Sequence, residues 1–118
     1  MERLIDTNVI LRYLLNDIPD MSEKAAAIIS EGAFVLPEII AEAVYVLDGV
    51  YEVPKTEICN VLTSLLEEVS INNKSVIVKA LNIFAKHNVD FVDCIIIARS
   101  KILGESVFSF DKKLNSLL

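Results

Sequence analysis

Residues 3–15 read RLIDTNVILRYLL. The first three of these predict a short strand, because Asp6, Thr7 and Asn8 interrupt the apolar run directly after them. Apolar residues at helical spacing then predict a helix over Val9–Leu15. A strand that passes directly into a helix is typical of chains in which the two elements alternate.

The same alternation continues to the end of the chain. Further helices are predicted over Met21–Ser30, Pro37 to about Val50, Pro54 to about Val69, Ser75–His87, Asp90–Leu103 and Asp111–Leu117. Further strands are predicted at Ala33–Leu36, Ser70–Asn72 and Ser106–Phe110. Ser22 is a possible N-cap, and Gly32 and Gly104 end the helices before them. The pattern predicts an α/β fold: one domain over residues 1–118, a three-layer α/β/α sandwich around a short parallel sheet.

The composition excludes several kinds of site. The 118 residues are 53% hydrophobic and include one histidine, His87, and two cysteines, Cys59 and Cys94. Zinc sites built from cysteine and histidine lack the necessary ligands. The three glycines stand apart, so neither a P-loop nor a dinucleotide-binding fingerprint is present.

The sequence also indicates where the protein works. Charged residues at Glu2, Arg3 and Asp6 interrupt the first residues, as a secretory signal would not allow. The apolar runs stop short of the ~20 residues that a membrane span requires. Because two isolated cysteines suit a reducing compartment, we expect a cytoplasmic protein without a membrane partner.

Four acidic residues come from four separated segments but share one predicted edge of the sheet. Asp6 follows the first strand, Asp111 follows the last, Asp93 lies in the first turn of a helix, and Glu42 lies early in another helix. Strand ends and following helix starts meet at one edge of a parallel sheet, where ligand sites form. Each aspartate also has a simpler interpretation: Asp6 and Asp111 as helix caps, and Asp93 with Asp90 as a capping box.

Glu42 is harder to explain as a structural residue. It interrupts a stretch, IIAEAVYVL, that is apolar nearly all round and is therefore predicted to be buried. A buried carboxylate costs several kcal/mol unless it is paired or bound to a metal. No lysine or arginine lies within one turn of it, so we expect a metal ion or a second acid as its partner.

Converging carboxylates favour a divalent cation. Two of them ~5 Å apart repel by roughly 3 kcal/mol at an effective dielectric constant of 20. Because cysteine and histidine are scarce, hard oxygen ligands predict one or two Mg²⁺ or Mn²⁺ ions. Setting the four acids aside changes the net charge from −6 to −2, which makes an RNA phosphate an acceptable substrate.

Taken in order, DTN at residues 6–8, Glu42 in a helix opened by Pro37, Asp93 within DFVDCIIIA, and SFD at residues 109–111 resemble the PIN-domain family. The resemblance covers essentially the whole chain and is greatest to the short VapC-type toxins of toxin–antitoxin pairs. It implies a Mg²⁺- or Mn²⁺-dependent ribonuclease that cleaves single-stranded RNA, with Asp6, Glu42, Asp93 and Asp111 as catalytic metal ligands. It also implies a homodimer and a possible antitoxin protein as partner.

Other residues take supporting roles under this resemblance. Thr7, Asn8 and Ser109 would steady the ligands, Ser109 providing the hydroxyl where the family often has threonine. Asp90 either caps its helix or approaches the metal through water. Carboxylate-held metal would activate water for in-line displacement of the ribose 3′ oxygen, leaving a 5′-phosphate and a 3′-hydroxyl.

Three basic residues are candidates for holding RNA phosphate. Arg12 shares a helix face with Asn8, and Lys112 and Lys113 follow Asp111. The alternative interpretation is that each of them is an ordinary solvated surface charge with no role in binding RNA.

Other functional classes fit less well. A receiver-type phospho-acceptor domain needs an acidic pair after its first strand and a lysine after its last, but Asp6 is single and the last predicted strand ends in Asp111. An aspartyl-phosphate hydrolase needs a second aspartate in place of Asn8. A catalytically silent PIN-like binding module stays open.

The mean hydropathy of +0.51 is high for a short chain and predicts apolar surface that another subunit covers. Residues 25–29 and 58–66 carry more apolar residues than one narrow stripe requires. We therefore expect a two-fold homodimer that packs through helices.

Overall fold

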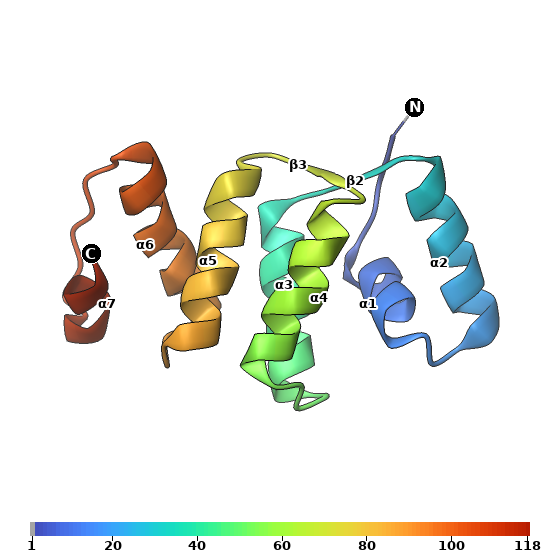
Figure 1. The fold of residues 1–118 in the computed structure, drawn as a ribbon, viewed down its shortest axis with the longest axis horizontal. Coiled ribbons are helices and arrows are strands. Elements are labelled where there is room, and N and C mark those ends of the chain that lie inside the picture. The colour runs from blue at the N-terminus through green and yellow to red at the C-terminus, as the bar shows by residue number, and fades with distance from the viewer. Residues whose placement is uncertain (1) are drawn as a thin grey trace.

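The structure is a computed structural model and describes residues 2–118 (Figure 1). The described residues alternate strands and helices as the sequence predicts. In chain order the elements are β1 (Arg3–Leu4), α1 (Thr7–Leu15), α2 (Pro19–Glu31), β2 (Ala33–Val35), α3 (Pro37–Gly49), α4 (Lys55–Leu66), β3 (Ser70–Ile71), α5 (Lys74–Lys86), α6 (Phe91–Leu103) and α7 (Lys112–Leu117).

The three strands form one parallel sheet in the order β1-β2-β3. Arg3 pairs with Ala33, and Phe34 pairs with Ser70 on the other side. Because a parallel pair needs a crossover, each strand is followed by helices before the next begins. The predicted α/β/α class, with its short parallel sheet, is confirmed.

Helix α2 begins earlier than the sequence pattern predicts. Its first residue is Pro19, whose ring presets the helical φ and whose missing N–H needs no partner there. Ser22 therefore lies inside the helix, is 5% exposed, and donates its hydroxyl to the carbonyl oxygen of Arg12 at 2.8 Å. The expectation that Ser22 is an N-cap was wrong.

The predicted strand at residues 106–110 does not form. This segment is outside the regular elements, between α6 and α7, and pairs with no strand of the described chain. Phe108 and Phe110 are 83% and 91% exposed, with their rings 5.1 Å apart in an edge-to-face pair. An apolar alternating pattern describes a half-buried surface, but a strand also needs a neighbour to receive its hydrogen bonds.

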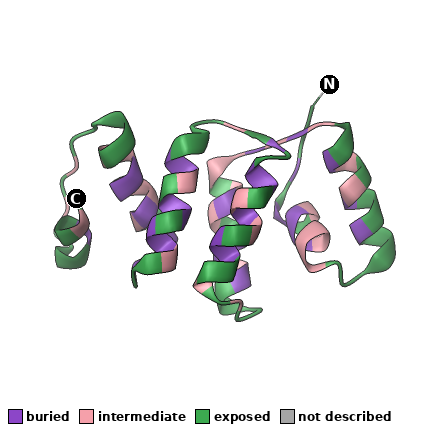
Figure 2. Cartoon of the chain, in the orientation of Figure 1, coloured by how far each residue is buried: buried purple, intermediate pink, exposed green. Residues whose placement is uncertain are grey.

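Most of the core comes from the helices, and Ile5 with Ala33 and Val35 of β2 adds to it (Figure 2). Ile58, Leu62, Leu65 and Leu66 of α4 are at most 1% exposed, so they cannot offer the free dimer face that the sequence predicts. Ala25 and Ile29 of α2 are also buried. The large apolar side chains that are exposed lie elsewhere, and include Tyr45, Val92, Phe108 and Phe110.

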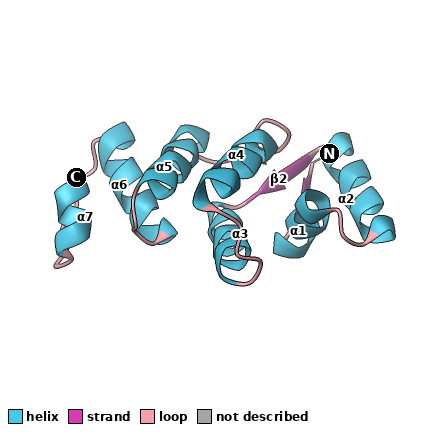
Figure 3. Ribbon diagram, turned by 60° about the horizontal axis from the view of Figure 1, so that its bottom comes forward, coloured by secondary structure: helices cyan, strands magenta, loops and turns pink. Residues whose placement is uncertain are grey.

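The molecule is long and flat, with principal extents of 45, 32 and 18 Å. Figures 1 and 3 both place α2 at one end of the long axis and α6 and α7 at the other, with α3, α4 and α5 between them. Strand β1 lies in the half that contains α1 and α2. No helix within residues 2–118 has the length and apolarity to cross a membrane.

Candidate active site

Asp6 lies between β1 and α1 and is the N-cap of α1. Its Oδ1 accepts a hydrogen bond from the backbone N–H of Val9 at 3.1 Å, which satisfies one of the free donors of the first turn. The residue is exposed, and Oδ2 has no hydrogen bond to residues 2–118. Capping therefore uses one oxygen and leaves the other available for a ligand.

Asp111 repeats this arrangement at the start of α7. Its Oδ1 accepts from the backbone N–H of Leu114 at 2.9 Å, while its own N–H donates to Ser109 Oγ at 2.9 Å. The side-chain amide of Asn115 donates to the carbonyl oxygen of Ser109 at 2.8 Å. Ser109 thus holds the backbone at Asp111 through a local side-chain turn.

Asp93 lies in the first turn of α6, close enough to two other acids to interact electrostatically with them. Burial raises the pKa of its carboxyl, and the negative charges of Asp111 and then of Asp90 raise it further. Asp90 occupies the N-cap position of α6 but makes no side-chain capping hydrogen bond. The capping-box alternative for this pair is therefore wrong, and both carboxylates remain free to bind a ligand.

Glu42 is exposed, so the expectation that it is buried was wrong. The buried face of α3 consists of Ile40, Ala43, Val44 and Leu47. Residues 42 and 45 point away from this face, and Tyr45 is 77% exposed although it is aromatic. An apolar run therefore does not by itself establish that the helix is buried all round, and Glu42 needs no buried partner.

The acids do not all come together within one chain. Across residues 2–118, no three side chains of aspartate, glutamate, histidine or cysteine are placed to hold a single metal ion. The interacting group is Asp93 with Asp111 and Asp90, and neither Asp6 nor Glu42 contributes to the raised pKa of Asp93. Residues 2–118 therefore bring Asp93 near Asp111 and Asp90, and the four-acid site stays a prediction.

A cavity of about 290 Å³ opens between α3 and the start of α6. Asp90 and Asp93 line it from one side, and Tyr45 and Asp48 line it from the other. Asp48 was not anticipated from the sequence, although its place near the end of an otherwise apolar helix could have drawn attention to it. It adds a further carboxylate to the lining of this cavity.

The donors fit a hard divalent cation better than a soft one. They are carboxylate oxygens, and mutual repulsion among Asp93, Asp111 and Asp90 is what a bound cation would relieve. Burial raises the pKa of the neighbouring Cys94 thiol to about 11, so this residue is a protonated thiol at neutral pH rather than a thiolate ligand. Next to Asp6, the buried hydroxyl of Thr7 has no hydrogen-bond partner in the part of the chain described.

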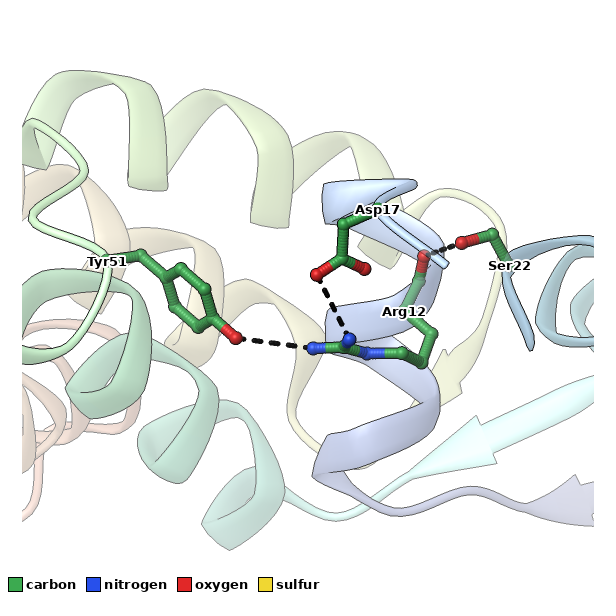
Figure 4. Close-up of polar contacts among 4 residues, drawn as sticks. All are labelled: Arg12, Asp17, Ser22 and Tyr51. Atoms are coloured by element: carbon green, nitrogen blue, oxygen red, sulfur yellow. Dashed lines mark hydrogen bonds and ion pairs between the residues drawn. The ribbon is translucent and has the colours of Figure 1, made fainter. Parts of the chain in front are cut away.

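Arg12, a candidate for binding RNA phosphate, already has partners (Figure 4). Its guanidinium donates to Asp17 Oδ2 at 3.0 Å and to the Tyr51 hydroxyl at 3.3 Å, and its side chain is 15% exposed. These bonds tie α1 to the loops that follow α1 and α3. Lys112 and Lys113 are exposed and form no ion pair with residues 2–118.

The short parallel sheet and the acids at its helix starts define an α/β protein whose candidate site is built from carboxylates alone. The chain belongs to the PIN-domain family, whose model, described as "PIN domain", matches residues 3–117. It is also similar to a VapC ribonuclease of Aquifex aeolicus (strain VF5), with 27% identity over 128 residues that cover 98% of this chain and 91% of the relative. The resemblance inferred from the ordered acids is thus confirmed at the level of the family.

Proposed function

We propose that this chain is a Mg²⁺- or Mn²⁺-dependent endoribonuclease that cleaves single-stranded RNA, and that it acts in the cytoplasm as the toxin of a toxin–antitoxin pair. The observation that carries the proposal is that the charges of Asp111 and Asp90 act on Asp93, although Asp111 comes from a different segment than the two acids at the start of α6. Membership of the PIN-domain family and the similarity to a protein named as a ribonuclease support it.

In this proposal, residues 1–118 work as one domain and four carboxylates, Asp6, Glu42, Asp93 and Asp111, hold one or two ions. The ion supplies Lewis-acid activation of water and neutralises charge on the phosphate. Ser109 holds the backbone of Asp111, while Thr7 and Asn8 stand beside Asp6. The products are a 5′-phosphate and a 3′-hydroxyl.

Lys112 and Lys113 are the residues we propose for binding RNA phosphate, because both are exposed and adjacent to Asp111. Arg12 contributes less, since binding phosphate would require it to give up Asp17 and Tyr51. RNA, a second copy of the chain and an antitoxin protein are the proposed partners.

A second candidate, a catalytically silent PIN-like binding module, is favoured by one observation. The described chain brings no three metal-binding side chains to a single point. A module of this kind would bind RNA through the same basic residues but leave it intact.

A cleavage assay separates the two candidates. Purified protein should cut single-stranded RNA with Mg²⁺ or Mn²⁺, stop in excess EDTA, and lose more than about 100-fold in rate in the double variant Asp6→Asn and Asp93→Asn. Glu57→Gln removes an exposed charge from α4 and serves as the matched control that retains activity. RNA binding without cleavage would support the silent module, and cleavage that is insensitive to EDTA would contradict the proposal.

A further inference from the structure

A cavity between α5 and α6 has a charge opposite to that of the protein. Its volume is about 240 Å³, and the lysines that line it are Lys79 and Lys86 of α5 and Lys101 of α6. No aspartate or glutamate of residues 2–118 lines it. The chain as a whole carries a net charge of −6, so a polyanion is repelled by most of its surface and attracted here.

The helical spacing explains how this cavity forms. Lys79, Asn82 and Lys86 are three and four residues apart, so they lie on one face of α5, and all three are exposed. Ile83 and Ile97 also line the cavity and are 7% and 0% exposed. The cavity therefore has an apolar inner wall that belongs to the core and a basic rim that faces solvent.

The three lysines of the rim have no counter-ion in the part of the chain that the structure describes. The ion pairs of residues 2–118 involve other basic residues, namely Arg12, Lys74 and Arg99. Like charges gathered around one cavity disfavour one another. A bound anion would relieve this repulsion.

The size of the cavity favours a small anionic group over a whole organic ligand. Pockets that enclose a drug-sized molecule have volumes of roughly 300–1,000 Å³, so a cavity of about 240 Å³ suits one charged group of a larger molecule. A lysine ammonium is a compact charge with three donors, which suits the oxygens of a phosphate.

The basic cavity lies close to the candidate active site along α6. Asp93, Ile97 and Lys101 follow one another at intervals of four residues, so they form one stripe that extends roughly 12 Å from the acid to the lysine. Phosphates of a stacked strand are about 3.4 Å apart along its axis. A strand that crosses Asp93 therefore reaches the cavity within a few nucleotides.

We propose that the cavity between α5 and α6 binds a backbone phosphate of the RNA through Lys79, Lys86 and Lys101, a few nucleotides from the bond that is cut. This inference rests on the proposed function for the nature of the polyanion. It adds a contact that lies apart from Lys112 and Lys113 and from the acids themselves.

Removing one lysine from each helix tests the cavity without any cleavage. In the Asp6→Asn and Asp93→Asn background, which keeps the RNA intact, Lys79→Gln with Lys101→Gln should weaken binding of a labelled single-stranded RNA by roughly 25-fold at about 0.1 M salt. The slope of log K against log salt concentration should become shallower by about 1.4, because two phosphate contacts are lost. Fluorescence anisotropy across a series of salt concentrations, in metal-free buffer, measures both.

Two matched variants in the same background show whether position or charge alone matters. Lys24→Gln with Lys74→Gln removes the same charge from exposed residues outside the cavity and should keep the affinity within about twofold. Lys79→Arg with Lys101→Arg keeps the charge and should restore the original slope. An equal loss in the two glutamine pairs, or a loss that arginine does not restore, would overturn the proposal.

Free phosphate has the same chemistry as an RNA phosphate, so a second measurement separates them. In a titration followed by NMR, RNA should shift the amide signals of Lys79 and Lys101 at concentrations at least about 100-fold below those that inorganic phosphate needs. Shifts caused by inorganic phosphate alone would overturn the assignment to RNA. Intact RNA binding in a wild-type chain that does not cleave would contradict the proposed function and leave the cavity assigned, so the two failures are distinguishable.

Discussion

The segments before Asp6 and before Asp111 are alike in sequence and unlike in structure. Each is a short apolar stretch that leads into an aspartate, and each aspartate caps a helix through Oδ1. Yet Ile5, directly before Asp6, is 4% exposed, whereas Phe110, directly before Asp111, is 91% exposed. The cap forms from residues three apart in the chain, whereas a strand depends on a neighbour that is remote in sequence. Local sequence therefore predicts the helix cap in both segments. The two segments differ in strand pairing, which depends on a partner remote in sequence.

The sharpest way to test this comparison is to truncate the residue before each aspartate. Ile5→Ala should lower the free energy of unfolding by about 2–4 kcal/mol, because it removes a buried side chain from the core. Phe110→Ala should change it by no more than about 0.5 kcal/mol, because its ring is exposed and is not part of the core. Urea unfolding at low protein concentration measures both. If Phe110→Ala were as costly as Ile5→Ala in dilute solution, Phe110 would have to pack within its own chain.

A smaller effect is expected from removing each cap. Asp6→Ala should cost about 1 kcal/mol, because the N–H of Val9 loses its acceptor. Asp111→Ala should cost a similar amount, but only locally, because α7 has only six residues. Amide hydrogen exchange at Val9 and Leu114 reports the two losses separately.

The corresponding asparagine variants are the controls, because asparagine caps helices about as well as aspartate. They should keep hydrogen-exchange protection close to that of the wild type. If Asp6→Asn frayed α1 as far as Asp6→Ala, the negative charge rather than the hydrogen bond would be what stabilises the helix.

The smallest expected effect is the dependence of stability on pH, which has opposite signs for Asp93 at the start of α6 and Glu105 just after its end. The raised pKa of Asp93 means that the folded state disfavours its ionised carboxylate. This destabilisation is absent at a pH below the pKa of Asp93 in the unfolded chain, and it is complete at a pH above the pKa of Asp93 in the folded chain. Asp93→Asn should therefore raise the melting temperature at pH 7 in metal-free buffer by about 1–3 °C, and the gain should vanish on acidification to about pH 3.

Glu105 provides the opposite case. Its hydrogen bonds with Arg99 lower the pKa of its carboxyl, so its stabilisation is present above the unfolded pKa and is lost as pH falls through the folded pKa. Glu105→Gln should therefore lower the melting temperature at pH 7 and have no effect at the acidic end. A lower melting temperature for Asp93→Asn at pH 7 would indicate that Asp93 stabilises its helix instead.

Local patterns predicted most of the fold. Pro37 opens α3 and Gly104 ends α6 in the left-handed conformation, as expected from their backbone preferences. The three paired strands were also predicted: β1 and β2 lie in short apolar stretches, and β3 lies between two predicted helices. The boundary of α2 was missed because Pro19 is a stronger start signal than Ser22.

The candidate site was predicted less completely. The proximity of Asp93 to Asp111 follows from where their helices begin, and the sequence indicated both acids. The burial of Glu42 was wrong, since the run around it was treated as uniformly apolar although one face of α3 is open to solvent. Asp48 was missed because its relation to Asp90 and Asp93 exists only once α3 packs near the start of α6.

The order of the elements along the chain has a consequence for synthesis. The third strand ends at Ile71, so the sheet and the first four helices can fold while the remainder is still being translated. At about 5–20 residues per second, Asp111 is added roughly 2–8 s after Ile71. Asp90, Asp93 and Asp111 all belong to this late part. A nascent chain in which the sheet has folded therefore still lacks three of its acids, so the proposed cleavage of RNA has to wait until Asp111 has been synthesised.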